Sequence, residues 1–129
     1  MSANFAIEII GPDQSVLKAE TEEVTLPSFE GEMGILKDHI SLITFLRPGI
    51  ITLKKNNEET KFFVEEGIVE FSKNNLLILT STAKNLTKLG INDINKIIKI
   101  SEEKIDQKDV SDKERYLLSH KIDVLKRLN

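Results

Sequence analysis

Hydrophobic and polar positions alternate along most of the first two thirds of the chain. In the segment Phe5–Ile10 the odd positions are all Phe or Ile, whereas the even positions include Ala6 and Glu8. A period of two is typical of a strand with one buried face. The same pattern predicts a series of further short strands, at 17–18, 24–26, 42–46, 50–54, 60–65, 68–71 and 76–80.

Turn residues separate these predicted strands. Gly11–Asp13 predicts a turn, and two Asn pairs, Asn56–Asn57 and Asn74–Asn75, predict hairpin tips. Pro27 is expected to end its strand, because proline has no N–H to donate to a sheet. The glycines of Gly31–Gly34 interrupt the alternation, so we expect a loop over 29–40. Short strands at this spacing favour a sandwich or barrel.

The hydrophobic period changes near residue 90. Gly90 and Asn92 suit a helix start, and a polar turn is expected at 106–110. Ser111 and Glu114 have the spacing of a capping box, which predicts the start of a second helix. Each helix has an apolar stripe: Ile91, Ile94, Ile98 and Ile105 on the first, and Leu117, Leu118, Ile122, Leu125 and Leu128 on the second.

The fold class predicted from these patterns is β + α. We expect an N-terminal antiparallel β-sandwich or barrel over residues 1–85, followed by a C-terminal antiparallel α-helical hairpin over residues 86–129. The best boundary lies within 83–89, where the strand pattern stops. Neither helix buries much surface alone, so the hairpin is expected to pack on itself, on the sheet or on a partner.

Composition narrows the function classes. The net charge is −3, from 18 basic and 21 acidic residues, so no nucleic-acid partner is expected. There is no cysteine, which excludes disulfides and thiolate metal sites. No apolar run approaches the roughly 18–20 residues of a membrane span. The N-terminus lacks the basic and long apolar regions of a signal peptide, so we expect the protein to act where it is made.

Candidate catalytic chemistry is sparse. The two histidines, His39 and His120, stand far apart in sequence and outside any metal-binding motif, so no metal site is predicted. No phosphate-binding glycine loop of the Walker type is present. Adjacent carboxylates occur at Glu22–Glu23, Glu58–Glu59, Glu65–Glu66 and Glu102–Glu103, where solvated surface charge is the favoured interpretation over a hydrolase site. We therefore expect no enzyme activity and no cofactor.

One segment carries a family resemblance. Gly31–Thr44 reads GEMGILKDHISLIT and is followed by Leu46–Ile50, LRPGI. Together they resemble the ε subunit of F-type ATP synthase, with its glycine loop, its His and its (K/R)PG turn. The stretches Glu66–Phe71 and Leu79–Ala83 are similar as well. The resemblance covers nearly the whole chain in the same order.

The resemblance implies a non-catalytic rotor subunit in the central stalk of a proton-translocating ATP synthase. In that family the sandwich packs on the γ subunit and touches the c-ring. The helical hairpin lies folded or extends into the α/β catalytic head, where it inhibits ATP hydrolysis. The implied location is peripheral, at the cytoplasmic face of the inner (plasma) membrane, as part of the complex.

The resemblance also implies site residues. The c-ring contact falls on Glu30, Gly31, Glu32 and His39, although a surface or turn-capping role for His39 is an even alternative. The catalytic-head contact falls on basic residues of the second helix, Arg115, Lys121, Lys126 and Arg127. A solvated helix surface is the alternative for each of them. Lys121 falls inside the apolar stripe and is expected to extend outward along its alkyl stem.

Departures from the family pattern also matter. Ser41 stands where the family usually has Pro, and Glu66 precedes Gly67 where the family often has a second Gly. Some ε subunits bind ATP through an acidic residue followed three positions later by Arg. The predicted first helix has no Arg, so ATP binding is not expected. The alternative function is a free-standing β-sandwich that binds a ligand and carries a structural helical tail.

Overall fold

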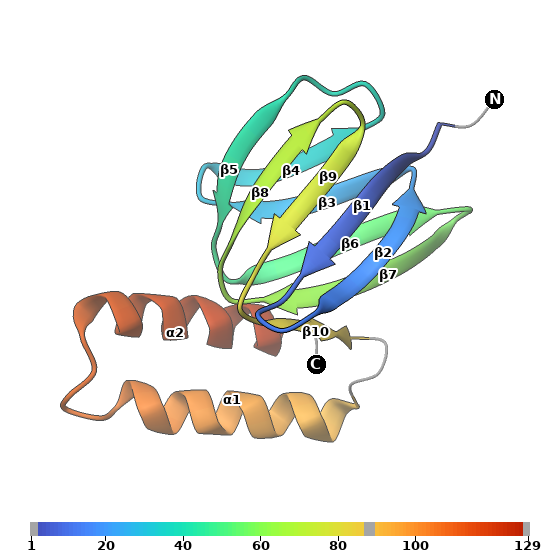
Figure 1. The fold of residues 1–129 in the computed structure, drawn as a ribbon. Helices are drawn as coiled ribbons and strands as arrows, with labels where there is room; N and C mark the ends of the chain where they lie inside the picture. Colours follow the sequence, from blue (N-terminus) through green and yellow to red (C-terminus); the bar gives the residue numbers. More distant parts are fainter. Residues whose placement is uncertain (1–2, 87–89, 128–129) are drawn as a thin grey trace.

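A computed structural model describes residues 3–86 and 90–127 of the 129-residue chain. Strands occupy the N-terminal part and two helices follow (Figure 1). The strands in the described part are β1 (Phe5–Ile10), β2 (Ser15–Thr21), β3 (Glu23–Ser28), β4 (Gly31–Leu36), β5 (Leu42–Leu46), β6 (Gly49–Lys55), β7 (Glu58–Val64), β8 (Gly67–Ser72), β9 (Asn75–Leu79) and β10 (Ala83–Asn85). The helices are α1 (Ile91–Ile105) and α2 (Asp112–Lys126).

The strands form one continuous hydrogen-bonded sheet that folds over on itself. Its order is β10-β7-β6-β3-β5-β8-β9-β1-β2, and β4 pairs with β3 off this path. The pairing of β1 with β9 is parallel, whereas the other pairings among the described residues are antiparallel. This arrangement confirms the predicted β-sandwich or barrel followed by two helices.

The sandwich core follows from the alternation seen in the sequence. In β1 the odd residues are buried and the even ones are partly exposed. Phe5 meets Phe71 of β8 edge to face, with ring centroids 5.6 Å apart. The other large core side chains come from both halves of the sheet, including Ile7, Leu26, Ile35, Leu46, Ile51 and Ile78. Burial of such side chains is the main stabilising term of a small domain.

The prediction of a loop over residues 29–40 is wrong for half of these residues. Residues Gly31–Leu36 form β4, a full partner of β3, with Val24 opposite Ile35 and Ser28 opposite Gly31. The chain reverses at Phe29 and Glu30, and Gly31 has φ 125°, the conformation that glycine allows. Pro27, expected to end its strand, lies within β3 opposite Glu32.

One hairpin tip is confirmed and another is shifted. Asn56 and Asn57 have φ of 53° and 63°, as expected for a tight turn with two left-handed residues. The second tip is formed by Lys73 and Asn74, with φ of 51° and 59°, because Asn75 is already the first residue of β9. Asn tolerates this backbone region better than most residues.

The two helices begin where the sequence indicated. Gly90 is the N-cap of α1, and its N–H donates to the Asp93 carboxylate at 3.3 Å. The Ser111 Oγ caps α2 by accepting from the Glu114 N–H at 3.1 Å. The expected stripe on α1 needs correction at Ile91, which is 65% exposed, whereas Ile94, Ile98 and Ser101 are buried. Leu128 of the second stripe lies outside the described residues.

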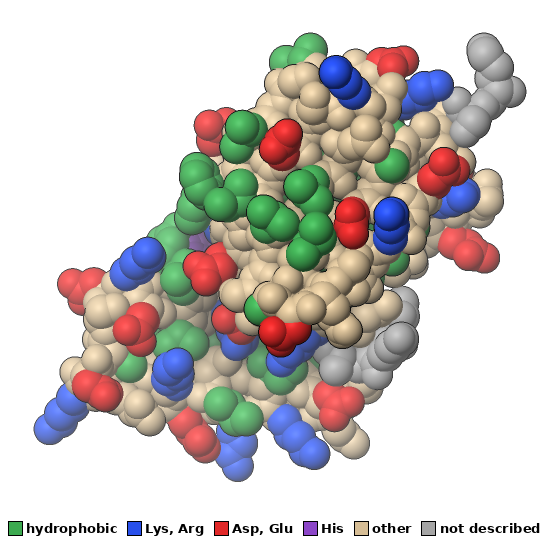
Figure 2. All heavy atoms as spheres, viewed as in Figure 1, with side chains coloured by type: hydrophobic (Ala, Val, Ile, Leu, Met, Phe, Trp, Pro, Cys, Tyr) green, Lys and Arg blue, Asp and Glu red, His purple; other side chains and the backbone are tan. Residues whose placement is uncertain are grey.

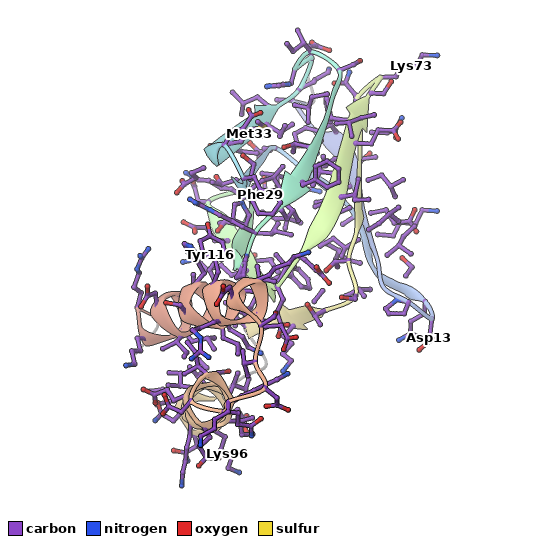
Figure 3. The ribbon with its side chains drawn as sticks, turned by 90° about the vertical axis from the view of Figure 1, so that its left-hand side faces the viewer. Asp13, Phe29, Met33, Lys73, Lys96 and Tyr116 are labelled. Carbon is purple, nitrogen blue, oxygen red and sulfur yellow. The ribbon has the colours of Figure 1, made fainter. Side chains whose placement is uncertain are left out.

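The helical hairpin lies against one end of the sandwich, with α2 closer to the strands than α1 (Figures 1 and 3). A second apolar cluster joins the two parts: Phe63 of β7 packs with Ile94, Ile98 and Leu125. The short β10 pairs with β7 and so stays with the sandwich, just before the predicted division at residues 85 and 86. Neither α1 nor α2 is long and apolar enough to cross a membrane.

Candidate functional site

Three of the predicted c-ring residues share the β3–β4 hairpin. Glu30 forms the turn with Phe29, Gly31 begins β4, and Glu32 lies one residue further on. Both carboxylates are exposed. The Ser28 Oγ donates to the Gly31 carbonyl at 2.6 Å, which closes the turn from within. The hairpin therefore presents two acidic side chains on a short, hydrogen-bonded projection.

His39 lies apart from that hairpin. It belongs to the β4–β5 loop, and the six residues of β4 separate it from the turn by about 20 Å at 3.4 Å per residue. Its ring packs edge-on against Phe71, with centroids 6.0 Å apart, and Nδ1 lies 2.8 Å from the Ile40 carbonyl oxygen. The structure thus does not gather the four predicted c-ring residues into one loop.

The loop that carries His39 is held by Asn74. The Asp38 N–H donates to Asn74 Oδ1 at 2.7 Å, and Asn74 Nδ2 donates to Asp38 Oδ1 at 2.9 Å. The β4–β5 loop and the β8–β9 turn therefore lie together. Figure 3 shows Lys73, of that turn, at the end of the sandwich far from the helices, whereas Phe29 lies closer to α2. The two candidate contact regions thus occupy different ends of β4.

A surface that the sequence analysis missed lies on the outer side of β5, β8 and β9. Phe45 is opposite Ile68, and Ile68 is opposite Leu79, so these three side chains form a row across the strands. Figure 2 shows hydrophobic side chains gathered over these strands. With two neighbours they make a surface that we call the apolar face: Phe29 (55% exposed), Ile43 (71%), Phe45 (53%), Ile68 (44%) and Leu79 (44%).

The apolar face has a signal in the sequence. The run Leu42–Leu46 contains four large apolar residues and does not alternate. A strand with one wet side would place polar residues at every second position, so this run indicates a strand apolar on both sides. A shallow groove of about 550 Å³, wide open to solvent, lies along the face between Pro12, Phe45, Ile68 and Leu79. Contiguous exposed apolar surface of this kind marks an interaction site.

The four basic residues predicted to contact the catalytic head are not equivalent. Lys121 Nζ pairs with Glu65 Oε1 of the sandwich at 2.5 Å, and its side chain is only 16% exposed. Lys126 pairs with Glu102 of α1 at 3.3 Å on the surface. The Arg115 guanidinium donates to the Ile105 carbonyl at 2.6 Å, at the C-terminal end of α1. Lys121 lies in the apolar stripe as predicted, but the expectation that it extends outward is wrong, because its ammonium pairs with a carboxylate of the sandwich.

Arg127 is the C-cap residue that follows α2, and it is exposed. It lines a hollow of about 290 Å³ between α2 and the sandwich, together with Glu32, Arg47, His120 and Asp123. A residue predicted to contact the c-ring, Glu32, and one predicted to contact the catalytic head therefore lie around one hollow while the hairpin is folded. His120 packs on Tyr116 with ring centroids 4.4 Å apart. Within residues 3–86 and 90–127, no group of three or more potential ligands could hold a metal ion.

Comparison with known proteins places the chain in a family. Residues 4–86 match the family described as "ATP synthase, Delta/Epsilon chain, beta-sandwich domain". The ATP synthase epsilon chain of Pelagibacter ubique is 48% identical over 100% of both chains. The ATP synthase epsilon chain of Rhodopseudomonas palustris is 30% identical, over 92% of this chain and 89% of its own.

Solved structures share the fold. A chain of the Euglena gracilis mitochondrial ATP synthase (OSCP/F1/c-ring, rotational state 1) aligns with a TM-score of 0.76 at 19% identity, covering 99% of this chain and 81% of its own. A chain of the Tetrahymena thermophila mitochondrial ATP synthase (central stalk and c-ring) aligns with a TM-score of 0.63 at 11% identity, covering 95% and 94%. The chain belongs to the delta/epsilon chain family of ATP synthase, as its sequence resemblance implied, and is a non-catalytic subunit of that complex.

Proposed function

We propose that this epsilon-type subunit works in the central stalk, where it joins the γ subunit to the c-ring. The apolar face carries this proposal. Exposed apolar surface is unfavourable in water, so its burial against a partner would hold the subunit in a complex. Family membership supplies the complex, and the two structural neighbours come from assemblies described by their c-ring and central stalk.

The γ subunit is the proposed occupant of the apolar face. Ile43 and Phe45 project from β5 into solvent and stand beside Ile68 and Leu79. Aromatic and aliphatic side chains at the centre of an interface contribute most of its binding energy. The groove along the face offers a place for a side chain of the partner.

The c-ring contact is proposed for the β3–β4 hairpin, through Glu30, Gly31 and Glu32. Its exposed carboxylates suit Arg or Lys donors of a partner. Gly34 follows on the same strand with no other atom within 4 Å of its missing Cβ, which leaves room for close approach of another backbone. A second contact is proposed for His39, which lies beyond the other end of β4 and packs on Phe71.

The proposed role of the hairpin is to restrain ATP hydrolysis. The structure has α1 and α2 folded against the sandwich, and an extended form reaching the catalytic head is part of the proposal. Arg115, Lys121, Lys126 and Arg127 would then meet acidic residues there, since opposite potentials favour association. The proposed location is peripheral, at the cytoplasmic face of the inner membrane, in a proton-translocating complex.

An ATPase titration tests the role of the hairpin. The full chain, and a version that stops after Asn85, are added to catalytic heads that contain γ but lack their own epsilon-type subunit. We expect both to bind and only the full chain to lower the rate. If both bind and neither lowers the rate, the hairpin is not a brake. If neither binds, the γ contact is contradicted, and a free-standing module that a small molecule stabilises against melting becomes the better account.

A further inference from the structure

Lys121 is a charged residue of α2 that forms an ion pair with the sandwich. It pairs with Glu65, which directly follows β7. The exposed fractions of the Lys121 and Glu65 side chains are 16% and 37%, so the pair is partly shielded from water. An ion pair in such a place is screened less by salt than one on the open surface. We call it the docking pair.

Two further polar contacts of the described hairpin residues join its own helices. Lys126 and Arg115 tie α2 to α1, through Glu102 and the Ile105 carbonyl. The apolar contact between the two parts centres on Phe63 and Leu125. The small apolar cluster and the docking pair therefore both hold the hairpin to the sandwich.

The surroundings of Lys121 are acidic on both sides. Glu65 and Glu66 of the sandwich and Glu114 of α2 line the same small hollow, and Lys104 of α1 is the second cation there. Like charges at close range repel. The positive charge of Lys121 offsets part of this repulsion, and without it the three carboxylates around the hollow would be compensated less.

We propose that Glu65 competes inside the chain for the same lysine that the catalytic head requires, so that the docking pair keeps the hairpin folded and withholds Lys121. The Lys121 ammonium cannot pair with Glu65 and with an acidic residue of the catalytic head at the same time, because the folded and the extended hairpin place it at different positions. Release of the hairpin then requires the docking pair to break, and an acidic site on the head that accepts Lys121 favours the released form by mass action. The withholding of Lys121 rests on the proposed function; the docking pair itself does not.

The test measures docking in the isolated full-length chain. The protein has no cysteine, so Glu58→Cys on β7 and Ser119→Cys on α2, both exposed positions, take spin labels at unique sites. Pulsed electron spin resonance then reports the docked and released populations. We expect Lys121→Met to raise the ratio of released to docked chains by about 5- to 30-fold, the effect of losing one partner of a shielded pair.

Lys126→Met is the matched control, because it removes a similar pair from the same helix without touching the sandwich. It is expected to leave the docked population unchanged within about twofold. Glu65→Gln is expected to release the hairpin less than Lys121→Met, since it also removes one of the repelling carboxylates. The exchange Glu65→Lys with Lys121→Glu is expected to restore docking.

Two results overturn the proposal. One is a released population after Lys121→Met that is no larger than after Lys126→Met. The other is failure of the charge exchange to restore docking where Lys121→Met alone releases the hairpin. The ATPase titration is read separately: docking that depends on Lys121, without any inhibition by the full chain, contradicts the proposed role at the catalytic head and leaves the docking pair standing.

Discussion

Gly49 and Pro27 lie so close together that a β-carbon on residue 49 would stand 2.5 Å from the Pro27 Cβ and 2.9 Å from its Cγ. The turn before β6 is thereby pressed onto β3, where the Arg47 N–H donates to the Pro27 carbonyl at 3.0 Å. The glycine of the Arg47–Gly49 turn is explained by this contact between two strands. Its φ lies outside the left-handed region, so packing and not backbone strain sets the requirement.

Gly49→Ala is therefore expected to destabilise the fold. The added methyl group has to displace a rigid proline ring, and overpacking of this kind costs about 1–3 kcal/mol. Gly34→Ala is the control: its added Cβ meets no atom within 4 Å, and its free energy of unfolding should stay within about 0.5–1 kcal/mol of the original. Urea unfolding measures both. Equal effects of the two variants would contradict the close contact.

The two isoleucines at 98 and 100 test how the hairpin docks. Ile98 is 6% exposed and packs with Phe63 and Leu125, whereas Ile100, on the same helix, is 65% exposed. Ile98→Ala is expected to cost about 2–5 kcal/mol of unfolding free energy, because it leaves a cavity in the second apolar cluster. Ile100→Ala should change it by no more than about 0.5 kcal/mol. A similar loss from both would mean that α1 does not dock by this face.

Ser111 is expected to stabilise α2 through its cap. Ser111→Ala removes the acceptor of the Glu114 N–H and should lower stability by about 0.5–2 kcal/mol. Ser119→Ala, at an exposed position inside the same helix, should be neutral or slightly stabilising, since Ala is the better helix former. Helix content by circular dichroism and thermal unfolding report both variants. A neutral Ser111→Ala would show that the cap contributes little.

The space above Gly34 leads to a prediction about assembly. A larger side chain, as in Gly34→Val, fits the free chain, because nothing lies within 4 Å of its Cβ and valine suits a strand. If a partner backbone approaches there, the same change weakens association with isolated c-rings by about tenfold or more, or about 1.4 kcal/mol. Sedimentation with c-rings in detergent measures this. Unchanged association would remove Gly34 from the contact.

The helices were predicted well because their signals are local. The Ser111 cap and the apolar spacing of Ile94 and Ile98 are complete within a few residues. Ile91 fits the same spacing but lies at the first helical position, away from the contact with Phe63, and stays exposed. Local periodicity predicts that a helix forms, whereas tertiary packing decides which residues at its ends are buried.

Strand β4 shows where local signals fail. Two glycines in six residues indicate a loop, yet only Gly31 takes the left-handed conformation. The segment forms a strand because it pairs with β3 and buries Ile35 completely. The three-residue β10 is likewise fixed by its neighbour β7 rather than by its own pattern. Because residues 31–36 form a strand and not the predicted loop, the candidate c-ring residues lie near its two opposite ends.

The interaction surfaces were only partly accessible from sequence. The four basic residues of the candidate catalytic-head contact could be named, but the partner of Lys121 lies 56 residues away in the sequence, and only the fold brings Glu65 to it. The apolar face was missed although Leu42–Leu46 lacks polar alternation, because a short apolar run also fits a strand buried on both sides. Only the exposure of Ile43 and Phe45 distinguishes the two cases.

The affinity of the full chain for its cognate γ subunit, measured by titration calorimetry, tests the central claim most directly. We predict stoichiometric binding that Phe45→Ser weakens by at least about tenfold, as expected for an aromatic residue at the centre of an interface. Ile100→Ser changes a residue that is 65% exposed, against 53% for Phe45, but lies on α1, and this variant should bind like the original chain. Absence of binding, or equal loss from both variants, would contradict the assignment of the apolar face to γ.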